Sequence, residues 1–440
     1  MSIFAYCREE KFKHIDMRKF FLGLAVALLA SVAIYAQPAM KKVQLVMVPN
    51  HADATYKVGE QVKIKVIALD CGVMLNDVKV DYEVSEDLMP AHSKKSITLK
   101  GNEGVINAGT MKEPGYLRVK ATVEHQGKKY TYLSTVGFEA EKLLPVVQEP
   151  AGFEEFWAKN VAQLQKVDLA PRMELIPERC TDDVNVYNVS YGNINNTRMY
   201  GVLTMPKKEG KYPAILRLPG YGVHAIGGNV KNAAQGAIIL EIGIHGIPVT
   251  LEGSVYTDLT YGALGNYHLI GIQDKSSYYY RRVYLGCVKG IDFLLSLPEC
   301  NGKVGTLGGS QGGTLSLVTS YLHKGVGATA VYFPAFSDQE GYLKGRTGGY
   351  PHHFKNEANR TKEKLETVRY YDAANFARKL QAPVYFAYGY NDLTCGPTTS
   401  RATYNAIPAA KTLVISQNTG HWLYPEHTAA MWDWIIKELQ

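Results

Sequence analysis

The 440-residue sequence lacks the usual patterns of a metal site or a disulfide scaffold. It has 6 cysteines, none of them in a C-x-x-C pair, and it has no H-E-x-x-H motif. Zinc sites and small disulfide-linked domains usually show such spacings. The neighbouring His352 and His353 are not a helically spaced histidine pair with a carboxylate, so we interpret them as loop histidines. We therefore expect no metal and no organic cofactor.

Runs of charge of one sign are also missing. Lys and Arg number 48 against 41 Asp and Glu, and the formal net charge of +7 is spread thinly along the chain. A nucleic-acid-binding protein usually carries a basic stripe or patch, so we expect no nucleic-acid partner. The sequence has no internal repeat. With 46% hydrophobic residues and this length, it predicts a globular protein of two domains.

Long apolar runs are confined to one segment near the N-terminus. "MRKFFLGLAVALLASVAIYAQ" begins at Met17 with two basic residues and ends in small residues at Ala36. This is the layout of a secretory signal, although an uncleaved anchor helix is the alternative. We predict a signal peptide over residues 1–36, with Met17 as a candidate for the true start. The protein should then be exported, to the periplasm or outside the cell, without stable membrane association after cleavage.

Residues 37–147 alternate apolar and polar side chains. "QVKIKVIA", "VKVDYEV" and "LRVKATV" each repeat with period two, which indicates strands with one buried face. Gln126 and Gly127 interrupt two such runs in the manner of a hairpin turn. Short alternating strands over about a hundred residues predict an immunoglobulin-like β-sandwich.

Residues 148–440 show a different sequence pattern. Apolar runs such as "AILRL", "AIILEIGI", "KVGTLG", "ATAVYF", "PVYFAYG" and "TLVIS" alternate with helical patterns. One helix is predicted over residues 279–297, where Val283, Cys287, Ile291 and Leu294 share a face. Continuous apolar strands that alternate with helices are typical of a mostly parallel sheet covered on both sides. The fold class is therefore α/β, preceded by the all-β domain.

The motif "GGSQGG" at residues 308–313 lies between a predicted strand and a predicted helix. A G-x-S-x-G sequence in this setting is typical of a nucleophile elbow, a turn so tight that the flanking residues must lack side chains. Ser310 would project from the sheet edge at a helix N-terminus, where the local field favours negative charge. The alternative is a glycine-rich turn with a passive serine.

A serine nucleophile needs a base and an acid that orients the base. Asp392 follows the strand "PVYFAYG", and His421 follows the strand "TLVIS". Both should lie at the same sheet edge as Ser310, in the chain order Ser, Asp, His that this kind of elbow uses. Asp338 also follows a strand, and it competes with Asp392 for the role of the acid, as does Asp372.

The negative oxygen formed during ester cleavage needs two backbone N–H donors. We expect one from Gln311, directly after the nucleophile, and one from Tyr221 in the loop "PGYG" after "AILRL". An ordinary glycine turn is the alternative for this loop.

Several longer motifs resemble those of one family. "FEEFW", "LPGYG", "YYRRVYLGCVKGIDFLLSLPE", "VGTLGGSQGG", "YGYNDLTCGP" and "TGHW" are similar to the acetyl xylan esterase and cephalosporin C deacetylase family of α/β-hydrolases. The resemblance implies an α/β-hydrolase fold. It also implies a catalytic triad of Ser310, Asp392 and His421, with Tyr221 as the second residue that stabilises the oxyanion. It also implies a homo-oligomer. Two departures are the stretch "AIILEIGIHGIP", where the family has R-G-Q, and Trp422, where it has glutamate.

These features together predict a secreted serine carboxylesterase. It should remove acetyl groups from acetylated xylan or related oligosaccharides through an acyl-enzyme. One alternative is a serine peptidase of the same fold, and another is an esterase for a different small acyl group. A sugar-binding protein with a degenerate enzyme domain is the alternative from another class.

Overall fold

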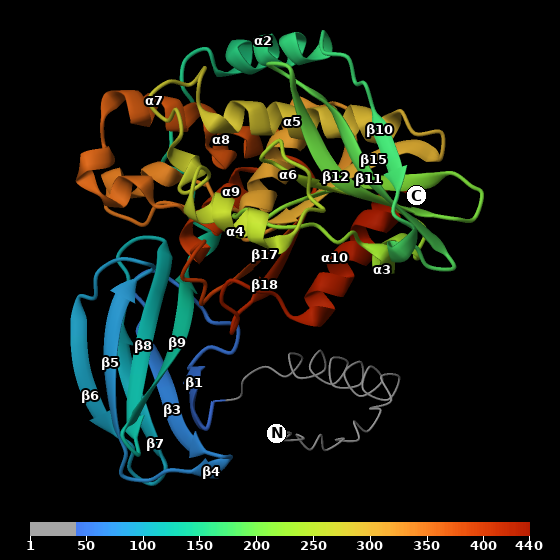
Figure 1. Cartoon of the computed structure of the whole chain (residues 1–440). Coiled ribbons are helices and arrows are strands. Elements are labelled where there is room, and N and C mark those ends of the chain that lie inside the picture. The colour runs from blue at the N-terminus through green and yellow to red at the C-terminus, as the bar shows by residue number, and fades with distance from the viewer. Residues whose placement is uncertain (1–40) are drawn as a thin grey trace, which may run out of the picture.

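The structure, a computed structural model, describes residues 41–440 (Figure 1). The signal peptide predicted over residues 1–36 lies outside them. No helix in residues 41–440 has the length and apolar character needed to cross a membrane. The cysteines of this range are free thiols, namely Cys71, Cys180, Cys287, Cys300 and Cys395.

Strands β1 to β9, called here the N-terminal β unit, form two sheets. One is four-stranded and the other five-stranded, with the order β2-β9-β8-β5-β6 in the larger. The alternation predicted from the sequence is present, since Val62, Ile64 and Val66 are buried between exposed lysines. The bounds are β1 (Val43–Pro49), β2 (Thr55–Tyr56), β3 (Val62–Asp70), β4 (Val73–Met74), β5 (Lys79–Glu86), β6 (Ser93–Thr98), β7 (Glu103–Gly109), β8 (Gly115–His125) and β9 (Lys128–Phe138).

The rest of the chain is built on a nine-stranded sheet of order β10-β11-β12-β14-β13-β15-β16-β17-β18. Pairs from β10 to β12 and the pair β12–β14 are antiparallel, whereas all pairs from β14 to β18 are parallel. The bounds are β10 (Arg172–Leu175), β11 (Val184–Asn193), β12 (Thr197–Pro206), β13 (Tyr212–Leu218), β14 (Ile238–Gly243), β15 (Cys300–Gly309), β16 (Val326–Tyr332), β17 (Val384–Gly389) and β18 (Lys411–Ser416).

Helices cover both faces of this sheet (Figure 1). On β13, Ile215 belongs to the core under α3 and α10, and its neighbour Leu216 belongs to the core under α5 and α6. Burial on both faces explains why these strands read as continuous apolar runs. The bounds are α2 (Phe153–Gln165), α3 (Val230–Ala233), α4 (Gly253–Tyr261), α5 (Tyr279–Leu295), α6 (Gln311–Leu322), α7 (Lys362–Tyr371), α8 (Ala373–Ala377), α9 (Pro397–Ala406) and α10 (Pro425–Glu438).

The predicted helix over residues 279–297 ends earlier, at Leu295. Pro298 explains the difference, because a proline disfavours helical geometry in the residue before it. Ser296 is the C-cap, and its N–H donates to the carbonyls of Asp292 and Phe293.

The N-terminal β unit lies beside α9 and the loops that follow β17 (Figure 1). The hydroxyl groups of Tyr116 and Tyr388 meet at 2.7 Å across this junction. The end of the β unit is therefore in direct contact with the end of the large sheet at which a site was predicted.

Candidate active site

The turn between β15 and α6 forces Ser310 into a backbone conformation that is rare for a residue with a side chain. Its φ is 55° and its ψ is −124°. The surrounding backbone holds this turn, because the Ser310 N–H donates to the Tyr332 carbonyl at 3.1 Å and the Ala335 N–H donates to the Ser310 carbonyl at 3.0 Å. Such strain is typical of functional positions that the neighbouring structure over-determines.

Two of the surrounding glycines are required because other backbone comes too close. A Cβ on Gly312 would lie 2.2 Å from the Leu218 carbonyl oxygen, and one on Gly308 would lie 2.5 Å from the carbonyl of Gly312. Neither glycine has a positive φ. The absence of side chains thus lets β13, β15 and α6 meet at one point, as a nucleophile elbow requires.

Asp392 and His421 are in direct contact. The Nδ1 atom of His421 lies 2.7 Å from Asp392 Oδ2. The other oxygen of Asp392 accepts the N–H groups of Thr394, at 2.7 Å, and Cys395, at 2.9 Å. Asp392 is fully buried, whereas the His421 side chain is 30% exposed. The carboxylate is thereby fixed, and it selects the imidazole tautomer that leaves Nε2 free to accept a proton.

Ser310 occupies the same edge of the sheet. The Ser310 N–H donates to the carbonyl of Tyr332, and the ring of the next residue, Phe333, lies 4.2 Å from the His421 ring. Within residues 41–440 the Ser310 hydroxyl has no hydrogen bond to His421. Such contacts are often completed only when substrate binds. The structure therefore joins two of the three predicted residues directly, and the catalytic role of all three stays a prediction.

The competing carboxylates serve other contacts. Asp338 Oδ1 accepts the N–H groups of Val146, at 2.7 Å, and Val147, at 2.9 Å, and its other oxygen pairs with Arg346. Asp372 accepts backbone N–H groups, including that of Asp338 at 2.8 Å. Burial and the charge of Asp338 raise the pKa of Asp372 to about 7. Asp338 braces the segment that connects the β unit to α2, and Asp372 braces the loop that carries Asp338. No hydrogen bond joins either of them to a described histidine.

The two predicted oxyanion donors are tied together by a side chain. Gln311 is fully buried, and its Nε2 donates to the Gly220 carbonyl at 3.0 Å. Its Oε1 accepts the hydroxyl groups of Tyr267, at 2.8 Å, and Tyr280, at 2.6 Å. In the described chain, the backbone N–H groups of Tyr221 and Gln311 have no protein acceptor. Both are therefore free to donate to a substrate oxygen.

Further aromatic groups hold the loop around Tyr221. The Tyr221 ring stacks on Tyr267 at 4.6 Å, and its hydroxyl meets His268 Nδ1 at 2.8 Å. His245 Nε2 lies 2.9 Å from the Gly222 carbonyl. Burial lowers the pKa of His245 to about 4, so this ring is neutral at pH 7 and its Nε2–H donates. Sequence reasoning gave Tyr267, Tyr280 and His245 no role, because a sequence pattern does not show which groups their side chains meet in the folded chain.

Cys395 and Trp422 complete the immediate surroundings. The buried Cys395 thiol is beside the Ser310 hydroxyl, and burial raises its pKa well above the usual value. Trp422 is 51% exposed, and its ring packs edge-on against Tyr424 at 5.3 Å. A large apolar surface thus remains open to solvent next to His421.

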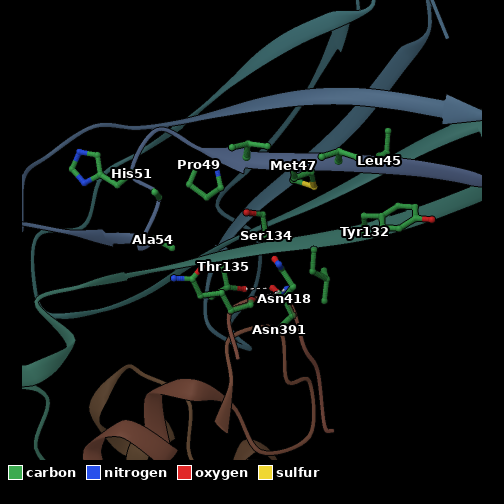
Figure 2. A pocket seen from close by; sticks show the side chains of 15 residues that line it. Leu45, Met47, Pro49, His51, Ala54, Tyr132, Ser134, Thr135, Asn391 and Asn418 are labelled. Carbon is green, nitrogen blue, oxygen red and sulfur yellow. Dashed lines mark hydrogen bonds between the residues drawn. The ribbon is translucent and has the colours of Figure 1, made fainter. Parts of the chain in front are cut away.

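A groove of about 440 Å³ lies behind the loop that carries Asp392 (Figure 2). It is lined by β1 and β9 of the β unit and by Asn391, Gln417 and Asn418 from the loops after β17 and β18. Its lining does not include Ser310, Asp392 or His421. The groove marks how closely the β unit approaches the loops that carry Asp392 and His421.

Comparison with known proteins gives a consistent result. The family profile described as acetyl xylan esterase (AXE1) matches residues 139–438. The chain is 39% identical over 399 residues to the acetyl esterase Axe7A of Xylanibacter ruminicola, and the match covers 89% of this chain and 90% of that protein.

Two solved structures have the same α/β-hydrolase fold. An acetyl xylan esterase from Paenibacillus sp. R4 is 25% identical with a TM-score of 0.61, and it covers 69% of this chain and 99% of its own. Acetyl xylan esterase 1 from Thermoanaerobacterium sp. JW/SL YS485 is 21% identical with a TM-score of 0.60, and it covers 69% of this chain and 98% of its own. The immunoglobulin-like character of the N-terminal β unit stays a prediction.

Proposed function

The chain belongs to the acetyl xylan esterase family and is a carboxylic ester hydrolase that acts on acetyl esters, and from this premise we propose that Ser310, His421 and Asp392 carry out the reaction. The contact of His421 Nδ1 with the buried Asp392 at 2.7 Å is the observation that supports this proposal most strongly. A buried carboxylate on Nδ1 keeps Nε2 available as a base and stabilises the imidazolium that forms when Nε2 takes a proton.

In the first half of the reaction, His421 takes the proton of the Ser310 hydroxyl while the serine oxygen bonds to the acetyl carbonyl carbon. The carbonyl oxygen becomes negative and accepts the N–H groups of Tyr221 and Gln311. The tetrahedral intermediate then breaks its bond to the alcohol oxygen. The alcohol leaves with the proton that His421 returns, and acetyl-Ser310 remains.

In the second half, water replaces the alcohol. His421 takes a proton from the water as its oxygen attacks the acetyl carbonyl carbon. Collapse of this second intermediate returns the proton to Ser310 and releases acetate. The residues of the chain supply the nucleophile, the base and the oxyanion donors.

We further propose acetylated xylan or its oligosaccharides as substrate, in line with the names of the relatives. Export fits this substrate, because a polysaccharide is met outside the cell membrane. The proposed order along the chain is a signal peptide over residues 1–36, an immunoglobulin-like β-sandwich over residues 37–147 and the catalytic domain over residues 148–440.

The test is acetate release from acetylated xylan and from p-nitrophenyl acetate. Ser310→Ala should lower turnover by about 10⁶-fold. Asp392→Asn should lower it by about 10⁴-fold, since the asparagine selects the wrong imidazole tautomer. Asp338→Asn is the matched control, which should keep near-normal turnover because Asp338 braces another segment. Near-normal turnover of Asp392→Asn, or fluorophosphonate labelling of the Ser310→Ala variant, would refute the assignment.

A further inference from the structure

We propose that Arg118, on strand β8 of the N-terminal β unit, is a positioning residue that holds the backbone of the loop carrying Asp392. This inference rests on the proposed role of Asp392 as the catalytic acid. It makes the β unit part of the active-site architecture, although none of its side chains reaches the reacting atoms.

Arg118 is almost completely buried, with 4% of its surface exposed. Its Nη2 donates to the carbonyl oxygens of Tyr390 and Asp392, both at 3.1 Å. The guanidinium therefore contacts the main chain of the catalytic acid itself. A planar guanidinium can bind several acceptors in a fixed geometry, which a lysine ammonium cannot.

A buried aspartate pairs with the same nitrogen of Arg118. Asp87, which is 2% exposed and follows strand β5, pairs with Arg118 Nη2 at 2.8 Å. Its other oxygen accepts the N–H of Thr398 at 3.1 Å, in the first turn of α9. The cation thus binds carbonyl groups at the start of the loop, and the anion binds an amide at a helix N-terminus beyond its end.

A third contact runs through strand β9. Arg118 Nε donates to Thr135 Oγ1 at 3.0 Å, and the Thr135 hydroxyl donates to Asn391 Oδ1 at 2.9 Å. Figure 2 shows Thr135 and Asn391 facing each other across the junction. The three consecutive residues Tyr390, Asn391 and Asp392 are therefore each bound to Arg118 directly or through one side chain.

The position of this backbone determines the position of the carboxylate. Asp392 is oriented by N–H groups of its own loop, those of Thr394 and Cys395, so that the loop and the carboxylate move together. A buried ion pair is a poor source of stability, because removing two charges from water costs about as much as their attraction returns. Precise placement of the loop gives the pair a function that an apolar pair of the same volume would not have.

The experiment removes both charges together. In the Asp87→Asn/Arg118→Met variant no charge is left unpaired and most of the buried volume is kept, so the chain should fold, as checked by thermal melting and near-UV circular dichroism. A displacement of about 1 Å can cost about 10²-fold in rate. We expect kcat for p-nitrophenyl acetate to fall by about 10-fold to 10²-fold with little change in KM.

The same double change is then made in an Asp392→Ala background. A residue that acts through Asp392 should have almost no effect once that carboxylate is gone, with kcat changing by less than about 2-fold. Asp338→Asn/Arg346→Met is the matched control, because Arg346 binds Asp338 and the Leu144 carbonyl, in the segment after the β unit, but does not touch the Asp392 loop. It should lower the melting temperature and leave kcat unchanged.

Two results would overturn the inference directly: a normal kcat of the double variant, or a fall in kcat that is equally large in the Asp392→Ala background. If the double variant fails to fold, a normal kcat of Arg118→Lys would overturn it instead. Arg118→Lys keeps the charge beside Asp87 but loses the planar guanidinium, so we expect kcat to fall, by less than in the double variant. Normal turnover of Asp392→Ala alone would instead refute the proposed function.

Discussion

Gln311 does more at the residue scale than supply a backbone N–H. Its side chain joins the first turn of α6 to the loop that carries Tyr221, through the carbonyl of Gly220 and the hydroxyl groups of Tyr267 and Tyr280. The spacing between the two proposed oxyanion donors is therefore fixed by one buried amide. A buried polar network of this kind is rigid as long as every member is paired.

Replacing Gln311 with leucine should disturb both stability and catalysis. The change leaves two buried tyrosine hydroxyl groups without their acceptor, at about 1–3 kcal/mol each, and it releases the Gly220 carbonyl. We expect a lower urea midpoint and a kcat reduced by about 10²-fold, because one oxyanion donor loses its position. Tyr280→Phe removes only one hydroxyl group and should cost less in both measurements. Equal kcat for wild type and Gln311→Leu would contradict this role.

The sequence predicted the local part of the site better than the long-range part. Ser310 and Gln311 were predicted from one six-residue motif, and Asp392 and His421 from their places after strands. Arg118 and Asp87 gave no signal, because each lies in an ordinary alternating strand or its loop, and their contacts with Asp392 and Thr398 form only in the folded chain. Periodicity shows which face of a strand is buried but not what covers it.

At the scale of elements, the site depends on how closely β13, β15 and α6 approach one another. Most strands of the large sheet were predicted from their apolar runs, because burial on both faces leaves a clear pattern. Strand β10 was missed, and all of its residues are exposed. The segment between β14 and α5 was also left unassigned, since its short helical turns are held by side-chain contacts such as that of Tyr267 rather than by periodicity.

Gly312→Ala should separate these elements. The new methyl group would lie 2.2 Å from the Leu218 carbonyl oxygen, which is backbone and cannot rotate away. We expect a loss of about 1–3 kcal/mol or more in the free energy of unfolding, measured with urea, and slower fluorophosphonate labelling of Ser310. Gly253→Ala, at the start of α4, is the control, because nothing lies within 4 Å of the added carbon. Equal stability of the two variants would contradict the close approach.

At the scale of the whole molecule, buried histidines should make stability depend on pH. Burial lowers the pKa of His268 to about 4 and that of His353 to about 3, with His268 and other nearby cations adding to the effect on His353. These rings stay neutral in the folded protein, whereas the unfolded chain binds protons below its ordinary pKa of about 6.5. Their contribution is therefore complete above pH 6.5 and is lost as the pH falls toward 4.

The expected slope is about 1.4 kcal/mol per pH unit for each such histidine. Urea unfolding between pH 7 and pH 4 measures it. His353→Gln removes one titrating group, so its stability should fall less steeply over this range than that of the wild type. Parallel slopes for wild type and His353→Gln would contradict the prediction.

The junction that Arg118 and Asp87 form also limits how this protein can be rearranged. A chimera that kept residues 148–440 and received a foreign module in front of them would lack the cation and the anion that bind residues 390–398. Such a chimera would be fully active only if the new module placed an arginine and an aspartate at the positions of Arg118 and Asp87. The N-terminal β unit is thus a structural part of this enzyme rather than an interchangeable attachment.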